Sequence, residues 1–175
     1  MKKIIFIAAL SFFGFANAQE GFKLGGHIGA PTSDNSSFTL GVDAAYRWNI
    51  AKGFDLGVAT GYSHYIAKSY DFGGNSYKGK DFGFIPVAVS GKYSFSGAPI
   101  GVGLDLGYGI STNSDVDGGF YFAPKFFYNM PSGELYVGYQ GISHNYGAGY
   151  YGPFKITGNA NTGAVVLGYN FNLKK

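Results

Sequence analysis

Bulky apolar residues alternate with small or polar ones along several stretches of the chain. The clearest stretch runs from Phe38 to Asn49, and the same period of two recurs from Phe54 to Tyr62 and from Ile100 to Tyr108. A period of two is typical of a β-strand with one apolar face. We therefore predict three strands in these stretches.

Five weaker stretches repeat the pattern and raise the predicted number of strands to eight, an even number that fits a closed antiparallel barrel. They are Phe22–Ala30, Phe82–Phe95, Phe120–Asn129, Leu135–Gly141 and Thr162–Leu173. In the second of them the apolar phase slips just before Pro86. Because proline cannot donate to the strand ladder, and because an extra residue resets the phase, we expect a β-bulge there.

The seven predicted connections alternate between longer and short ones. The longer connections are Pro31–Ser37, Ala67–Lys80, Ser111–Gly119 and Ile142–Asn161, and the short ones are Ile50–Gly53, Ser96–Pro99 and Met130–Gly133. A membrane barrel has short periplasmic turns and longer outer loops. We therefore expect both chain ends on the periplasmic side.

The direction of the two strand faces separates a membrane barrel from a soluble one. A lipocalin buries its bulky face, whereas an outer-membrane barrel turns that face outward. Here the other face is mostly Gly, Ala and Ser with scattered charges, which suits a narrow interior. We expect the bulky face to point outward, and a soluble lipocalin-like binder is the alternative if the faces are reversed. Seven aromatic residues fall near the short-turn strand ends, where an interfacial girdle would lie: Trp48, Phe54, Tyr93, Phe95, Tyr128, Tyr169 and Phe171.

The composition agrees with one β-rich unit. The chain has 175 residues, 30 of them glycine, and 19% are aromatic. The many glycines disfavour a helical bundle, and the aromatic content disfavours a disordered chain. The absence of cysteine excludes disulfides and thiolate metal sites.

The first residues predict a secretory signal peptide. A basic start at Lys2 and Lys3 precedes the apolar run Ile4–Phe15, and Ala16-Asn17-Ala18 offers a cleavage pattern of small residues. The run is too short to be a helical membrane anchor. We predict a signal peptide over residues 1–18 and a barrel domain over residues 19–175. Loss of the two lysines leaves nearly balanced charges, so no nucleic-acid partner is expected.

Nine ionisable residues fall on the inward phase of the predicted strands and suggest a lumenal charge network. They are Lys23, His27, Asp43, Arg47, Asp55, Lys92, Asp105, Lys125 and Glu134. Unpaired burial of these charges would be costly, so we expect them to pair. The network is interpreted as a structural plug, because an eight-stranded barrel has little room for anything but side chains. A narrow gated pore or proton path is the alternative.

The sequence gives little support for metal binding or catalysis. The three histidines, His27, His64 and His144, have no partners at ligand spacing, so no metal or cofactor is expected. Ser63-His64 and Ser143-His144 are adjacent pairs, and neighbours on a strand point to opposite faces. Neither pair forms a nucleophile and base, and we predict that the protein is not an enzyme.

The two long outer loops are the predicted seat of any specific binding. Their aromatic residues, set among Gly, Ser and Asn, could form a recognition surface, or the strands could continue outward with these aromatics packed on each other. The candidates are Tyr70, Phe72, Tyr77, Tyr146, Tyr150, Tyr151 and Phe154.

The segments Phe84–Val87, Gly91–Phe95 and Val165–Phe171 resemble small outer-membrane proteins of the OmpX and OmpA-barrel kind. The resemblance is greatest to the porin-like "outer membrane beta-barrel protein" family common in Bacteroidetes, and it covers about residues 22 to 171. It implies an all-β, eight-stranded antiparallel up-and-down transmembrane barrel in the outer membrane of a Gram-negative cell. Tyr169 and Phe171 resemble that family's signal for the barrel-assembly machinery, although Asn172 to Lys175 follow them here.

The resemblance also sets expectations for partners and function. It implies a monomer that contacts outer-membrane lipid and lipopolysaccharide, and that meets periplasmic chaperones and the assembly machinery during biogenesis. We predict a structural or surface-interaction role, such as adhesion or binding of an unidentified surface ligand through the outer loops. A narrow channel is the first alternative. A lipid A-modifying enzyme, an activity found in some eight-stranded barrels, is a weaker one.

Overall fold

The computed structural model describes residues 21–33, 36–72, 75–78, 81–113, 117–151 and 154–173. Of the residues between 70 and 80 and between 145 and 160, it describes backbone only. The predicted signal peptide and its cleavage site lie outside the described residues. In the described ranges, the chain forms no helix with the length and apolarity that crossing a membrane requires.

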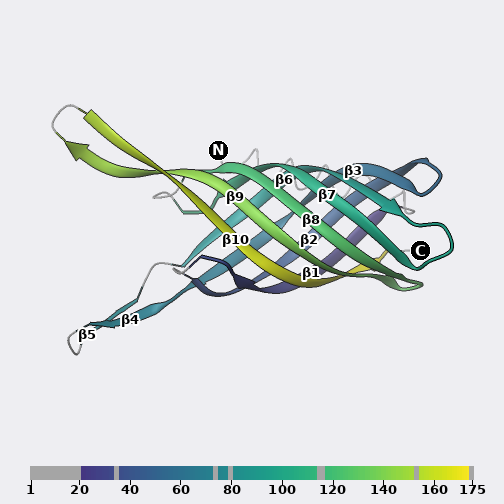
Figure 1. Ribbon diagram of the computed structural model, residues 1–175, viewed down its shortest axis with the longest axis horizontal. Helices are drawn as coiled ribbons and strands as arrows, with labels where there is room; N and C mark the ends of the chain where they lie inside the picture. Colours follow the sequence, from purple (N-terminus) through teal and green to yellow (C-terminus); the bar gives the residue numbers. More distant parts are fainter. Residues whose placement is uncertain are drawn as a thin grey trace.

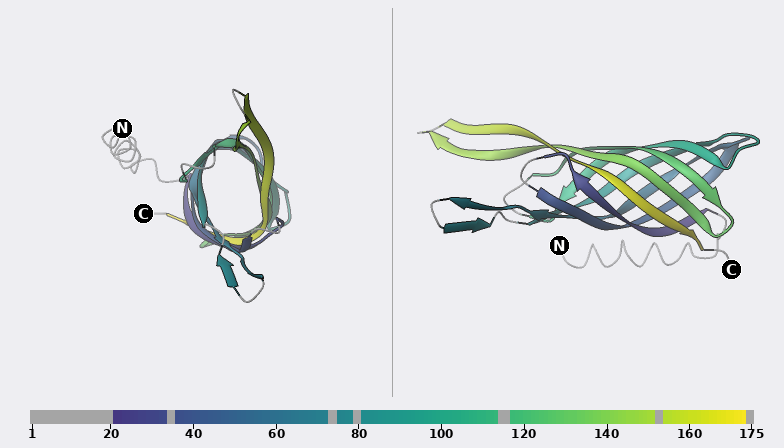
Figure 2. Two further views of the ribbon diagram at one scale, coloured as in Figure 1. Left: turned by 90° about the vertical axis from the view of Figure 1, so that its left-hand side faces the viewer. Right: turned by 60° about the horizontal axis from the view of Figure 1, so that its bottom comes forward.

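Eight antiparallel strands close into a barrel, which is seen from the side in Figure 1 and along its axis in Figure 2. They are β1 (Phe22–Pro31), β2 (Ser36–Ala51), β3 (Phe54–Ala67), β6 (Phe82–Ser94), β7 (Ile100–Ser111), β8 (Gly119–Met130), β9 (Gly133–Tyr151) and β10 (Phe154–Asn172). Each strand pairs with its neighbours in chain order, and β1 closes the barrel against β10. The prediction of an eight-stranded up-and-down barrel is confirmed.

The barrel has two unlike ends. The short-turn end carries the connections after β2, β6 and β8, together with the first residue of β1 and the last residue of β10. Two of its turns contain a glycine with positive φ, Gly53 at +76° and Gly97 at +85°, a conformation that other residues adopt only under strain. The opposite end, called here the long-connection end, carries the remaining loops.

Two hairpins occupy the connections that were predicted as long loops. Strands β4 (Ser69–Phe72) and β5 (Asn75–Lys78) pair with each other in a separate small sheet. Strands β9 and β10 stay paired along the whole hairpin, up to the pair formed by Tyr151 and Phe154. In Figure 1 this hairpin and the β4–β5 hairpin both project beyond the same end of the barrel. Of the two alternatives for these loops, the backbone thus follows the one in which strands continue outward.

The bulge expected before Pro86 is absent, and that prediction is wrong. Strand β6 keeps one register against both β3 and β7 from Phe84 to Tyr93. The apolar phase changes because Phe82 and Phe84 point into the barrel, where Phe84 is fully buried. Pro86 only interrupts the pairing with β3, as expected of a residue without an N–H.

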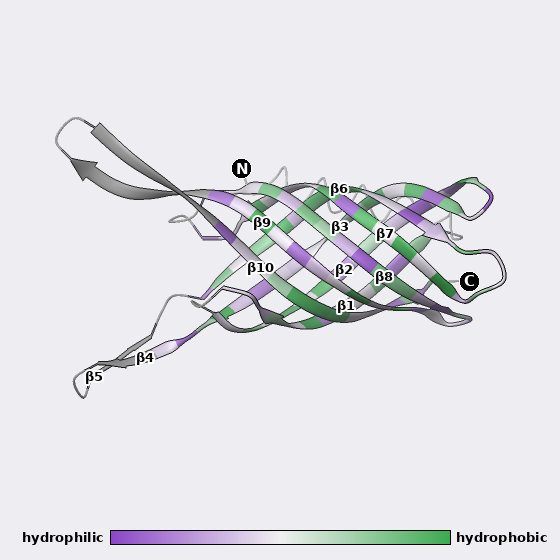
Figure 3. Ribbon diagram, in the orientation of Figure 1, coloured by the Kyte–Doolittle hydropathy of each residue, from purple (hydrophilic) through white to green (hydrophobic). Residues whose placement is uncertain are grey.

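Bulky apolar side chains cover the outside of the barrel. Val42, Val87 and Leu167 are 58%, 57% and 51% exposed, and similar residues occur on every barrel strand. Figure 3 shows hydrophobic positions recurring along the barrel wall. A lipocalin-like protein would bury this face, so its exposure contradicts the soluble alternative.

The predicted aromatic girdle lies on this outer face near the short-turn end. Phe54, Tyr93, Phe95, Tyr128 and their equivalents are exposed or half-buried. Edge-to-face ring pairs join members of the girdle to each other or to a neighbour: Tyr46–Trp48, Tyr93–Phe95 and Tyr169–Phe171, with centroids 4.7, 5.2 and 4.7 Å apart.

Candidate functional site

All nine ionisable residues on the predicted inward phase lie in the lumen. Five are buried: His27, Arg47, Lys92, Asp105 and Glu134. The other four, Lys23, Asp43, Asp55 and Lys125, are half-buried. They come from seven of the eight strands, so the barrel closure brings together side chains that are far apart in the sequence.

Glu134 is the centre of the charge cluster at the short-turn end. Arg47 Nη1 donates to Glu134 Oε1 at 2.9 Å, and Lys92 Nζ donates to Glu134 Oε2 at 2.6 Å. Asn170 Nδ2 adds a third bond at 3.2 Å. We call Arg47, Lys92, Glu134 and Asn170 the Glu134 cluster. One buried carboxylate thus compensates two buried cations, each of which would be costly alone.

An aromatic ring supports the same two cations. Arg47 Cζ lies 5.4 Å and Lys92 Nζ 4.7 Å from the centre of the Phe127 ring, within the range of a cation–π interaction. Arg47 Nε also donates to Ser90 Oγ at 2.9 Å, and Lys92 Nζ also donates to Asn129 Oδ1 at 2.6 Å. The Glu134 cluster is therefore held by charge pairing, neutral acceptors and ring contact together.

Lys23 and Asp55 have neutral partners instead of each other. Lys23 Nζ donates to Asn172 Oδ1, and Asn49 Nδ2 donates to Asp55 Oδ1 at 2.8 Å. These contacts lie closest to the short-turn end, where water is near.

Farther up the lumen, His27, Asp43, Ser63 and Tyr136 form a second group, called here the Asp43 cluster. His27 Nδ1 is 2.9 Å from Asp43 Oδ2, and Tyr136 donates its hydroxyl to the same oxygen at 2.6 Å. Ser63 Oγ is 3.2 Å from His27 Nε2. The ring of His27 packs directly against Gly41. A side chain at position 41 would collide with this ring.

Ser63, His27 and Asp43 reproduce the contacts of a serine-hydrolase triad, in which a carboxylate orients a histidine that contacts a hydroxyl. Sequence reasoning missed this arrangement, because it compared Ser63 with its neighbour His64. His64 points the other way and bonds through Nδ1 to the Tyr62 hydroxyl at 2.9 Å. Ser63 is only 4% exposed, and its hydroxyl bonds to Gln140 Oε1 at 3.3 Å as well as contacting His27, so the three residues belong to a buried hydrogen-bonded chain.

A third ion pair completes the lumenal charges. Lys125 Nζ donates to Asp105 Oδ2 at 2.7 Å and lies 4.9 Å from the centre of the Tyr136 ring. Tyr136 thus touches both this pair and Asp43.

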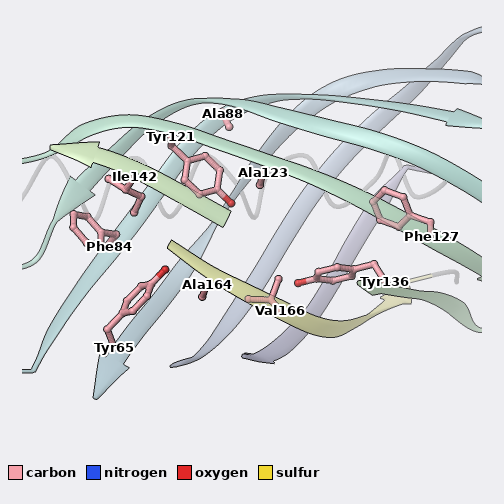
Figure 4. Close-up of a cluster of buried hydrophobic side chains, with 10 residues drawn as sticks. All are labelled: Tyr65, Phe84, Ala88, Tyr121, Ala123, Phe127, Tyr136, Ile142, Ala164 and Val166. Atoms are coloured by element: carbon pink, nitrogen blue, oxygen red, sulfur yellow. The ribbon is translucent and has the colours of Figure 1, made fainter. Parts of the chain in front are cut away.

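Aromatic and aliphatic side chains fill the lumen toward the long-connection end. Tyr65, Phe82, Phe84, Tyr121 and Ile142 form this aromatic layer. Figure 4 shows four of them gathered together, with Phe127 and Tyr136 farther along the lumen. Tyr65 stacks on Phe82 at 5.0 Å between ring centres and meets Phe84 edge-to-face at 6.4 Å. Tyr65 and Phe84 are both completely buried.

The remaining predicted residues lie outside the lumen. The seven aromatic loop candidates fall on the two projecting hairpins, and their side chains lie outside the described part of the structure. Tyr169 and Phe171 point outward near the short-turn end, where the Tyr169 hydroxyl is 2.7 Å from Ser132 Oγ. Among the described residues, no three His, Asp or Glu side chains are grouped to hold a metal ion.

Comparisons with solved structures show the fold. The crystal structure of Neisserial surface protein A is similar with a TM-score of 0.57 at 18% identity, over 87% of this chain and 97% of that chain. The Yersinia pestis outer membrane protein Ail has a TM-score of 0.46 at 14% identity, over 87% of this chain and 100% of that one. The outer membrane protein AlkL has 0.43 at 14%, over 90% and 93%. No family model and no curated protein sequence matches the chain. The similarity to Neisserial surface protein A, together with the closed barrel of eight strands, shows that the protein has the fold of a small eight-stranded outer-membrane barrel.

Proposed function

We propose that this protein is an integral outer-membrane barrel whose projecting hairpins serve a surface-interaction role, such as adhesion or ligand binding. The observation that supports membrane insertion best is the exposed bulky face, which would be unfavourable in water and is suited to lipid. All barrel strands carry it. In this proposal the outward face contacts outer-membrane lipid and lipopolysaccharide.

The proposed orientation puts the short-turn end in the periplasm. The aromatic girdle then lies at the inner interface, and β4–β5 and β9–β10 extend to the cell exterior. The proposal includes export by the predicted signal peptide over residues 1–18, assembly guided by Tyr169 and Phe171, and a monomeric state. It also includes the finer likeness to OmpX-like and Bacteroidetes barrels.

The filled lumen supports a role for the hairpins rather than for transport. The aromatic layer blocks one half of the lumen and the ion pairs fill the other. A proton path is also interrupted at Gln140, whose amide bonds to Ser63 and Tyr65, and at Arg47, because neither an amide nor a guanidinium readily releases and regains a proton. A narrow pore is therefore the weaker candidate.

Membrane insertion is tested by cell fractionation and heat-modifiability on SDS gels. We expect the protein in the outer-membrane fraction after salt and carbonate washing, with a mobility that changes on boiling. Release as a soluble periplasmic protein would contradict the proposal.

The surface role is tested by cutting back one hairpin at a time. One variant replaces residues 145–159 with Asn-Gly, which joins the paired residues His144 and Ala160 through a two-residue turn. The matched control replaces residues 70–77 with the same turn between the paired Ser69 and Lys78. Bacteria that express each form are tested for adhesion to epithelial monolayers and to surfaces coated with matrix protein. We expect loss of adhesion with the first deletion and unchanged heat-modifiability in both. Equal adhesion by all forms and by cells without the protein would overturn the surface role alone.

A further inference from the structure

A small cavity lies in the middle of the lumen, between the Glu134 cluster and the Asp43 cluster. Its volume is about 10 Å³, close to the space that one water molecule needs. Besides Thr60, its polar lining comes from Asp43, Arg47, Asp105, Tyr121, Lys125 and Asn170. The cavity therefore touches the two clusters and the Lys125–Asp105 pair.

Asn170, one of the lining residues, carries a buried acceptor without a described partner. The residue is 3% exposed, and its Nδ2 donates to Glu134. Its Oδ1 is buried and accepts no hydrogen bond from any described residue. Buried acceptors in native proteins are almost always satisfied, by protein or by ordered water. Oδ1 lies over Gly25, which pairs with Asp43 in the neighbouring strand, so the amide oxygen faces the same part of the lumen as that carboxylate.

The other lining groups have unused bonding capacity as well. Asp43 and Asp105 each accept through Oδ2, and none of the described bonds uses their Oδ1 atoms. Arg47 donates through Nε and Nη1 but through no described bond at Nη2. The residues that line the cavity therefore include both acceptor and donor groups that could bond to one further molecule.

The charges of the lining select a neutral occupant. Two carboxylates and two cations line the cavity, so a metal ion would face Arg47 and Lys125 and an anion would face Asp43 and Asp105. A molecule with two donors and two acceptors matches both kinds of partner. Water is the smallest such molecule, and buried waters commonly make about three hydrogen bonds to buried polar groups.

We propose that this cavity is the binding site of one ordered water molecule. The water donates to Asn170 Oδ1 and to the carboxylate of Asp43 or Asp105, and it accepts from Arg47 or Lys125. It joins the Glu134 cluster, the Asp43 cluster and the Lys125–Asp105 pair into one polar network through the middle of the barrel.

The test is a crystal structure of the refolded full barrel at a resolution that shows ordered water. We expect one density peak within hydrogen-bond distance of Asn170 Oδ1 and of at least two other lining groups. Crystals soaked in bromide and in caesium salts separate the occupants, because water gives no anomalous signal. An empty cavity would overturn the proposal, as would an anomalous peak, which would show an adventitious ion only.

Two substitutions test the assignment of the density peak to this cavity beyond the structure of the unchanged protein. Ala59→Val fills the cavity, because Ala59 lines it, whereas Ala88→Val enlarges a residue that pairs with Ala59 but is not part of the lining. We expect the peak to be lost in the first variant and kept in the second. If Ala59→Val does not refold, Asn170→Leu replaces it, and loss of the peak is again expected. A peak retained in the Asn170→Leu variant would place the water on other groups and overturn the assignment to Asn170.

Discussion

The two halves of the lumen are filled in different ways. Toward the short-turn end, ion pairs with full side-chain burial hold the strands together around Glu134. Toward the long-connection end, the aromatic layer fills the same cross-section without any charge. A narrow barrel can therefore be closed either by charge pairing or by ring packing. The charged half should therefore lose stability mainly when a charge is removed, and the aromatic half mainly when side-chain volume is removed.

The largest expected effect comes from removing the shared carboxylate in the charged half. Glu134→Leu leaves Arg47 and Lys92 buried without a counter-charge, which should cost about 3–5 kcal/mol of the free energy of unfolding. The measurement is urea unfolding in lipid or detergent. It is monitored by fluorescence of the single tryptophan and by gel mobility.

A matched control for Glu134 is Asp55→Asn. This carboxylate also points inward, but its described bond is to the neutral Asn49 in an exposed contact. We expect a loss of about 1 kcal/mol or less, as for exposed polar contacts. Equal losses in the two variants would mean that the Glu134 ion pairs add nothing beyond an ordinary polar contact.

In the aromatic half the matching change is loss of volume. Phe84→Ala removes a fully buried ring and should cost about 3 kcal/mol, within the range for such truncations. The control is Phe120→Ala, since Phe120 is exposed on the outer face, where lipid or detergent replaces the lost contacts. The same unfolding assay applies. A cost for Phe120→Ala as large as that for Phe84→Ala would argue against an aromatic layer that stabilises the lumen.

The Asp43 cluster lies between the two halves and should give an intermediate effect. Asp43→Asn weakens the bonds from His27 and Tyr136 to a charged acceptor, worth about 1.5–3 kcal/mol. Ser63→Ala removes only the far end of the same chain, with contacts of 3.2 and 3.3 Å, and should cost about 1 kcal/mol. Unfolding midpoints of the two variants decide the order. A larger loss for Ser63→Ala would place the main contribution at the hydroxyl instead of the carboxylate.

Strand positions and the direction of the lumenal charges could both be predicted from the sequence. An alternation with a period of two identifies a strand and also shows which of its residues share a face. Every residue on the inward phase of a strand points inward, as Asp43 and Arg47 do on β2. The same rule failed at Phe82 and Phe84, since it equates apolar with outward. Near the long-connection end the interior itself is apolar, and hydrophobicity no longer distinguishes the two faces.

Partners across the lumen could not be predicted, because they depend on how the strands are staggered around the barrel. Ser63 meets His27 from a strand that is not its neighbour in the sheet, and no local spacing records that contact. The continuation of β9 and β10 was one of two alternatives, and the sequence could not decide between them for a different reason. Their outer segments are rich in glycine and tyrosine and lack alternation, although the backbone stays paired to Tyr151 with one register shift between Ile156 and Thr157.

A small effect is expected where one hydroxyl is removed from the aromatic half, and this change contrasts the two halves most directly. Tyr65→Phe deletes the hydroxyl that accepts a 3.3 Å bond from Gln140 and leaves the ring packed against Phe82 and Phe84. The loss should be about 0.5–1.5 kcal/mol, the value of a neutral hydrogen bond, and unfolding midpoints measure it. Removal of the Glu134 carboxylate in the charged half should cost far more than this. Removal of the Phe84 ring in the aromatic half should also cost more. A loss for Tyr65→Phe as large as that for Phe84→Ala would mean that polar contacts hold both halves, and the distinction between them would fail.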